Sequence, residues 1–184
     1  DNKNNWQCAL AEAAFMTGLE RNAEVVTMCS YAPLFAHSEG WQWTPDLIWF
    51  DNLRSYGTPN YYVQKLFSTN KGTQVLPMLT GNKPLTGQKG LYASAVLDSN
   101  TKEAILKLVN SSSTPQVSNI ELKGTGKISP TAKVMMLASP NLEGVNSLDD
   151  PQAIHPSEET IAIKGKKLNL ILPPHSFSVI RLKV

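Results

Sequence analysis

Side chains that could perform chemistry by themselves are scarce in this sequence. The adjacent pairs Asp149-Asp150 and Glu158-Glu159 are the most obvious candidates for general acid and base work. Neighbouring residues on a strand point to opposite faces, so neither pair can act together on one substrate atom. The three histidines are far apart in the sequence and lack metal-ligand spacing. The residues therefore predict no acid/base pair, no metal site and no cofactor.

Residues suited to binding a sugar occur close together in the first third of the chain. Trp41 and Trp43 share a loop, and aromatic faces stack well on the C–H faces of sugars. Asp51 and Asn52 follow the apolar run Leu47–Phe50. Polar residues at the carboxyl end of a barrel strand point towards an active site. We take Trp43, Asp51 and Asn52 as the candidate substrate-binding residues.

Each candidate also has a structural interpretation, which the sequence leaves open. The two Trp rings could pack the loop onto the rest of the protein. Asp51 could cap the helix expected after Tyr56. His37 lies in the same loop and is the one histidine worth testing, although we favour an ordinary loop position for it.

The elements before residue 72 have an α/β texture. Apolar residues at helix-face spacings predict a helix that begins near Trp6 and ends near Asn22. Val25–Tyr31 is a nearly continuous apolar run, typical of a strand buried on both faces of a parallel sheet. Thr58-Pro59 predicts the start of a second helix. A (β/α)8 barrel needs about 250 residues, so these elements would be only its last units.

From Thr73 onward the sequence alternates strand-like segments with turn residues. The expected strands are Gln74–Met78, Leu91–Asp98, Ala104–Asn110, Ser118–Leu122, Lys133–Ala138, Thr160–Ile163, Leu168–Leu172 and Ser176–Lys183. In the last of these, Phe177, Val179, Ile180 and Leu182 mark one face, with a slip near Ile180. Many short strands without intervening helices indicate an antiparallel β-sandwich.

The predicted fold is therefore mainly β. A jelly-roll-like sandwich would occupy residues 73–184, preceded by the last helix-strand-helix piece of a (β/α)8 barrel in residues 1–72. The chain opens without an initiator Met or a signal peptide, so we expect it to be an excised piece of a longer protein.

The composition argues against two classes of partner, nucleic acids and membranes. A formal charge of +2 and the lack of a long Lys/Arg cluster argue against a nucleic-acid partner. No apolar run is long enough to cross a membrane. Cys8 and Cys29 are expected to be buried free thiols. Asn110-Ser111-Ser112 is a glycosylation sequon, which otherwise predicts only a turn.

Several longer segments resemble one family of enzymes. They are Leu10–Asn22, Met28–Phe35, Tyr56–Tyr62, Leu91–Ala95, Asn146–Pro151 and Leu172–Ser178. The first three resemble the helix after the nucleophile strand, the last barrel strand and the last barrel helix of α-L-arabinofuranosidases of glycoside hydrolase family 51. The other three resemble the sandwich of that family.

The resemblance implies retaining hydrolysis of terminal arabinofuranosyl groups by two Glu carboxylates about 5 Å apart. In such enzymes both carboxylates lie upstream of the segments found here, so this chain would hold no catalytic residue. Glu12 and Glu20 are expected to be helix-surface carboxylates. The resemblance also implies an arabinose-containing oligo- or polysaccharide, such as arabinan or arabinoxylan, as the substrate. A secreted or periplasmic location is favoured over a cytoplasmic one.

A non-catalytic carbohydrate-binding or structural sandwich module is the alternative function. Such a module has no use for a buried parallel strand between two helices, and residues 73–184 contain only Tyr92 and Phe177 as aromatics. If the chain is instead a fragment of an enzyme, the strand Val25–Tyr31 would lack the neighbouring strands and helices of the barrel. Self-association of the fragment would then cover the exposed apolar residues.

Overall fold

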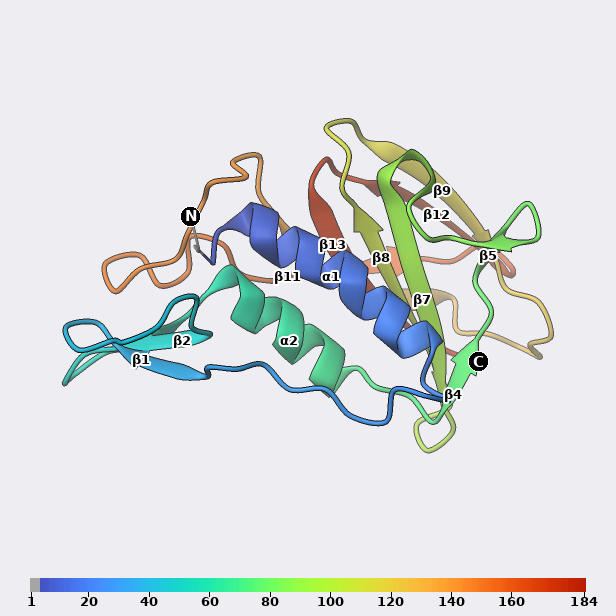
Figure 1. Ribbon diagram of the computed structural model, residues 1–184. Helices are drawn as coiled ribbons and strands as arrows, with labels where there is room; N and C mark the ends of the chain where they lie inside the picture. The colour runs from blue at the N-terminus through green and yellow to red at the C-terminus, as the bar shows by residue number, and fades with distance from the viewer. Residues whose placement is uncertain (1–3) are drawn as a thin grey trace.

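The computed structural model describes residues 4–184, which form two α-helices, a six-stranded sheet and three smaller sheets (Figure 1). Residues 1–3 of the expected 1–72 unit lie outside the described residues. The helices cover one face of the large sheet, and a two-stranded sheet of residues 116–121 and 167–172 covers the other, which gives three layers. No helix within residues 4–184 is both long and apolar enough to span a membrane.

Local sequence signals position both helices. The helix α1 is Trp6–Arg21, and the Asn5 side chain caps it by accepting a hydrogen bond from the Cys8 backbone N–H at 2.9 Å. The helix α2 is Pro59–Thr69, with Thr58 as its N-cap and proline in its first turn. Both predicted helices are confirmed.

The large sheet is antiparallel throughout, with the strand order β11-β10-β13-β8-β7-β4. Its strands are β4 (Gln74–Leu76), β7 (Leu91–Asp98), β8 (Glu103–Asn110), β10 (Thr131–Ala138), β11 (Ser157–Ala162) and β13 (Ser176–Lys183). The small sheets pair β9 (Gln116–Glu121) with β12 (Lys167–Leu172), and β5 (Leu79–Thr80) with β6 (Lys83–Pro84). Every strand predicted after Thr73 is present, and the mainly β sandwich is confirmed.

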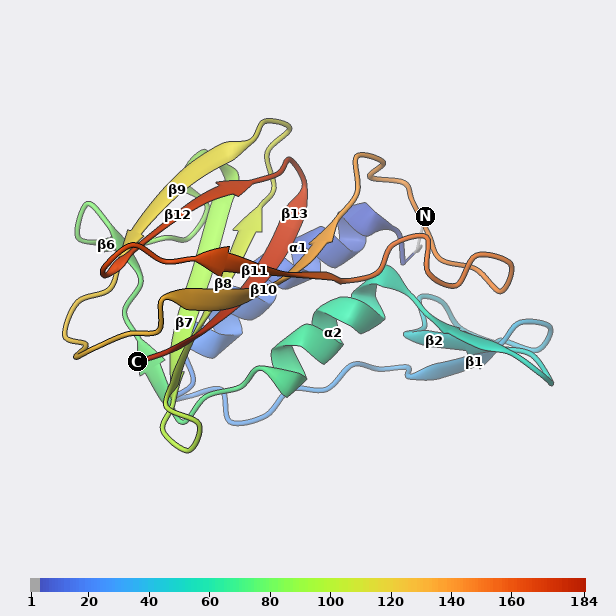
Figure 2. The same cartoon turned by 180° about the vertical axis from the view of Figure 1, so that it is seen from behind.

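Both faces of the large sheet are buried, which the sequence did not predict. On β8, Ile105 and Val109 belong to the core cluster under the helices, whereas Leu106 and Leu108 belong to the cluster under the second layer. Figure 2 shows this second layer, β9 and β12, in front of the large sheet, with α1 behind it. On β13, Phe177 and Val179 face the helices, and Ile180 and Leu182 face the second layer. The expectation of one apolar face with a slip near Ile180 is therefore wrong, because the strand has two apolar faces in regular register.

The predicted buried strand Val25–Tyr31 is also wrong. The segment makes no strand, and Val25 is 73% and Met28 is 88% exposed. A strand buried on both faces needs neighbours on both edges, and the described residues offer none to this run. The strand of the expected helix-strand-helix piece is thus not formed by this run, and Cys29, which lies in this segment, is exposed rather than buried. Cys8 is likewise exposed, on the outer side of α1.

Three short strands form a separate sheet after this segment. β1 (Phe35–His37) runs parallel to β2 (Ile48–Phe50), and β2 pairs antiparallel with β3 (Ser55–Gly57). This sheet lies at one end of the molecule, beyond the start of α2 (Figure 1). It carries the residues that the sequence singled out for sugar binding.

Candidate functional site

The candidate residues lie at one edge of the three-stranded sheet. β1 and β2 are parallel and His37 is in register with Phe50, so the carboxyl ends of both strands meet at that edge. The loop with Trp41 and Trp43 leaves β1, and Asp51 and Asn52 directly follow β2. The structure therefore brings together two segments that the sequence had placed on separate elements.

His37 and Asn52 are in contact across this edge. His37 Nε2 lies 3.4 Å from Asn52 Oδ1, and the imidazole meets the Phe50 ring edge-on at 5.2 Å between centroids. The Glu39 backbone N–H donates to His37 Nδ1 at 3.2 Å. Since Nδ1 accepts, a neutral ring carries its hydrogen on Nε2 and donates it to Asn52. The contact fixes the direction of the Asn52 amide.

Within the described part of the chain, the Asp51 side chain bonds only to residues of its own turn and to none of the other candidate residues. Its Oδ1 accepts hydrogen bonds from the backbone N–H groups of Leu53 and Arg54 at 2.8 and 2.6 Å, and its Oδ2 pairs with the Arg54 guanidinium at 2.9 Å. The backbone donors, and then Arg54, hold the pKa of Asp51 below its usual range. Asp51 therefore shapes the β2–β3 turn as an anion, while the N-cap of α2 is Thr58.

The two Trp side chains differ in their surroundings. Trp41 meets Trp49 of β2 edge-on, with ring centroids 6.1 Å apart. Trp43 leaves 63% of its surface exposed. Trp41 thus helps to hold the loop on the sheet, and Trp43 presents an accessible indole face of the kind that stacks on sugars.

The two helix carboxylates are not on the surface, which corrects the expectation for them. Glu12 accepts hydrogen bonds from the Asn60 and Gln64 amides of α2, and burial raises the pKa of Glu12. Glu20 has a side chain only 15% exposed and pairs with Lys107. Eight residues along a helix span about 12 Å, well beyond the spacing of a retaining carboxylate pair. Both carboxylates face the protein because α1 packs against α2 and the sheet, and neither forms a catalytic pair with the other.

The glycosylation sequon has a structural role. Asn110 of the sequon is fully buried, and its Nδ2 donates to the carbonyl oxygens of Thr114 and Pro173 at 2.9 and 2.8 Å. That nitrogen is therefore closed to glycosylation in the folded chain. Across residues 4–184, no group of three or more His, Cys, Asp or Glu side chains is arranged to hold a metal ion.

Comparisons with known proteins give a consistent result. A family model described as the α-L-arabinofuranosidase C-terminal domain matches residues 1–176. Alpha-L-arabinofuranosidase 1 of Arabidopsis thaliana is 37% identical over 179 residues, which cover 92% of this chain and 25% of that protein. The extracellular exo-α-L-arabinofuranosidase of Streptomyces chartreusis is 52% identical over 93 residues, covering 48% of this chain and 11% of that protein. The chain thus spans about a quarter of the length of the first curated relatives that it matches.

Solved structures give the same grouping. A structure described as an arabinose-bound MgGH51 α-L-arabinofuranosidase matches with a TM-score of 0.89 at 36% identity, covering 99% of this chain and 28% of that chain. The α-L-arabinofuranosidase of Thermotoga maritima matches with a TM-score of 0.78 at 18% identity, covering 98% of this chain and 39% of that chain. At that lower identity the likeness shows a shared fold.

Proposed function

The chain belongs to the α-L-arabinofuranosidase C-terminal domain family of glycoside hydrolase family 51, and we propose that it forms part of a retaining α-L-arabinofuranosidase. The whole protein would release terminal arabinofuranosyl groups from arabinan, arabinoxylan or their oligosaccharides. The observation that carries this proposal is the family match across residues 1–176. Both catalytic carboxylates would lie outside this chain, and we expect it to be inactive alone.

We further propose that residues 1–72 complete a (β/α)8 barrel and that residues 73–184 are the C-terminal sandwich. The exposed run that contains Val25 and Met28 supports this division, because it has the composition of a buried parallel strand without the neighbours of one. The parallel pair β1 and β2 supports it as well.

Within that barrel, Trp43, Asp51 and Asn52 would serve the sugar site in different ways. Trp43 would stack on the substrate through its exposed indole. Asn52, oriented by His37, would hydrogen-bond a sugar hydroxyl. Asp51 would act indirectly, by holding the turn that presents Asn52.

A sandwich that binds carbohydrate by itself is less well supported. Binding modules of this kind need exposed aromatic side chains, yet Phe177 is fully buried and Tyr92 packs against the core. A structural role for residues 73–184 fits better, since the sheet buries the apolar faces of α1 and α2.

A secreted or periplasmic location is part of the proposal. The name of the Streptomyces chartreusis relative, which describes an extracellular enzyme, supports it.

The stereochemistry of the reaction tests the proposed activity. The whole protein should release arabinose from an aryl α-L-arabinofuranoside with retention of configuration, as followed by proton NMR before mutarotation. Inversion of configuration, or the absence of arabinose release from arabinofuranosides, arabinan and arabinoxylan, would contradict the proposal.

A further inference from the structure

A lysine occupies the centre of the apolar face that carries the helices. Lys107 lies on β8 between Ile105 and Val109, which both belong to the core cluster under α1 and α2. Its side chain is 0% exposed. Lysine is almost never buried in this way unless it is paired, so its partners indicate what the residue does.

Its partners come from the C-terminal ends of both helices. Lys107 Nζ lies 2.5 Å from Glu20 Oε1 in the last turn of α1, and it donates to the carbonyl oxygen of Asn70, the C-cap of α2, at 2.8 Å. The Phe67 ring of α2 lies 5.3 Å from the same nitrogen. Ser94 Oγ of the neighbouring strand β7 donates to Glu20 Oε2 at 2.5 Å. One buried cation therefore joins two helix ends to the middle of the sheet.

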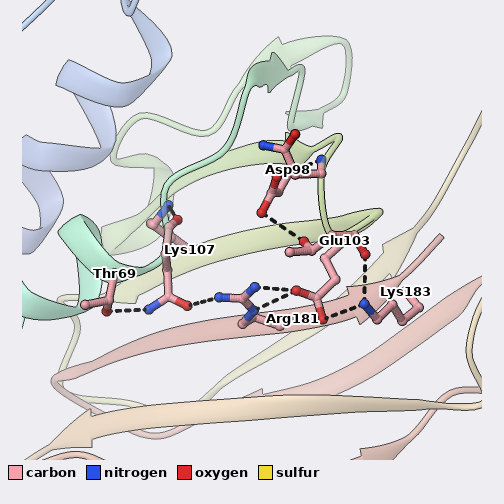
Figure 3. Close-up of polar contacts among 9 residues, drawn as sticks. Thr69, Asp98, Glu103, Lys107, Arg181 and Lys183 are labelled. Carbon is pink, nitrogen blue, oxygen red and sulfur yellow. Dashed lines mark hydrogen bonds and ion pairs between the residues drawn. The ribbon is translucent and has the colours of Figure 1, made fainter.

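Asn70 extends the contacts along the sheet. Its Oδ1 accepts from Arg181 Nη1 at 3.1 Å, and its Nδ2 donates to Leu66 O within α2 at 2.8 Å. Arg181 of β13 also pairs with Glu103, which lies 3.7 Å from Lys183 Nζ (Figure 3). The end of α2 is thus bonded to β8 through Lys107 and to β13 through Arg181.

The opposite ends of the helices are held by hydrogen bonds that do not involve Lys107. The Trp6 backbone N–H donates to Gly144 O at 2.8 Å, and Trp6 Nε1 donates to His175 O at 2.9 Å. Asn146 Nδ2 donates to Gly57 O just before α2 at 2.9 Å. The N-terminal and C-terminal ends of the helix layer are therefore attached independently.

We propose that Lys107 is a charge-dependent attachment point that fixes the C-terminal ends of α1 and α2 to the sheet, so that these ends open locally when its charge is removed. Burial lowers the pKa of Lys107, and the Glu20 carboxylate acts in the opposite direction. Removing one partner of a buried pair leaves the other charge uncompensated in a poorly solvated position, which is strongly unfavourable. The helix ends can relieve that cost by separating from the sheet.

Hydrogen exchange on the Lys107→Met variant of the 184-residue chain tests the proposal, since exchange resolves local from global opening. We expect backbone amides near residues 17–21 and 66–70 to exchange about a hundredfold faster. Amides of β8, β10 and β13, and those of the first turn of α1, should keep their protection. Unchanged helix amides, or an equal loss of protection in helices and sheet, would overturn the proposal.

Two further variants complete the experiment. Lys133→Met is the matched control, because Lys133 pairs with Glu158 on the same large sheet but both side chains are about half exposed. It should leave every segment at the wild-type exchange rate. Glu20→Gln should speed exchange in the same helix turns as Lys107→Met, by a smaller factor, and it carries the test if Lys107→Met does not fold. Unchanged helix turns in Glu20→Gln would count against the attachment point.

Discussion

Trp43 and Asn52 are the residues at which substrate affinity should respond first. We predict that Trp43→Ala or Asn52→Ala in the whole protein raises KM for arabino-oligosaccharides by about tenfold, because each would remove a proposed contact to the bound sugar. The effect on kcat should be smaller, since we propose both residues as binding residues and place the catalytic carboxylates outside this chain. Steady-state kinetics measure both values.

Leu53→Ala provides the control for these two variants. Leu53 follows Asn52 directly and is 94% exposed, but it has no aromatic or polar group to offer a sugar. Its substitution should leave KM unchanged. An equal effect of Leu53→Ala and Trp43→Ala would indicate loss of loop structure rather than loss of a sugar contact.

Glu12 gives the chain a defined pH dependence. Burial raises the pKa of Glu12 in the folded state above its unfolded value of about 4.3. The folded state then binds more protons than the unfolded state between those two values, so stability falls as pH rises through that window. The free energy of unfolding of wild type relative to Glu12→Gln should decline across it and be constant on either side. Urea denaturation at a series of pH values measures this difference, and a flat difference throughout would contradict it.

The sequence could predict residue roles only where the partners are local. The helix starts near Trp6 and at Thr58 could be predicted because they are set locally, where Asn5 and Thr58 each accept a hydrogen bond from a backbone N–H three residues ahead. The contact between Glu20 and Lys107 joins residues 87 positions apart, and no local pattern reports it. Both helix carboxylates therefore looked like surface residues until the packing of α1 was known.

At the scale of elements, α2 depends on its cap. Thr58 is buried, its side chain accepts from the Tyr61 backbone N–H at 3.3 Å, and its hydroxyl donates to Leu47 O at 2.9 Å. We predict that Thr58→Ala lowers the free energy of unfolding by about 1–2 kcal/mol. Thr69→Ala, at the exposed end of the same helix, should change it by less than about 0.5 kcal/mol. Chemical denaturation of both variants checks the ranking, and equal effects would show that the cap is not responsible.

Most strands could be predicted because the turns between them depend on local sequence. Residues such as Asp98-Ser99-Asn100 favour a turn by themselves, whatever the rest of the chain contacts. The strand predicted at Val25–Tyr31 is absent for the opposite reason. An apolar run of this kind forms a strand only when neighbouring elements bury both of its faces, and residues 4–184 do not supply those neighbours. The prediction of a single apolar face on β13 was wrong because helices cover one side of the sheet and strands cover the other.

At the scale of the whole molecule, the exposed apolar residues should make the chain associate with itself. Phe15, Val25 and Met28 are each more than 60% exposed, and exposed apolar patches are uncommon in stable monomers. We predict concentration-dependent dimers or larger species in sedimentation velocity. Val25→Lys with Met28→Lys should shift the chain towards monomer. A wild-type monomer at high concentration would contradict the prediction.

The arrangement of layers was the least predictable feature of the whole molecule. The sequence indicated a sandwich after residue 73 and a barrel-like piece before it. It indicated that the sandwich would hold residues 6–71, but not which face of the sheet α1 and α2 would cover, because that contact depends on apolar surfaces far apart in the chain, such as the stacked rings of Phe67 and Phe177 at 5.2 Å.

Hydrolysis of an aryl α-L-arabinofuranoside by the 184-residue chain and by the whole protein tests the central claim most directly. We predict that the chain shows no turnover above background and that the whole protein is active, because the proposed carboxylate pair, which would supply most of the rate enhancement, would lie outside this chain. A Glu12→Ala/Glu20→Ala variant of the chain serves as the control. Turnover by the purified chain that survives in this double variant, or an inactive whole protein, would contradict the claim.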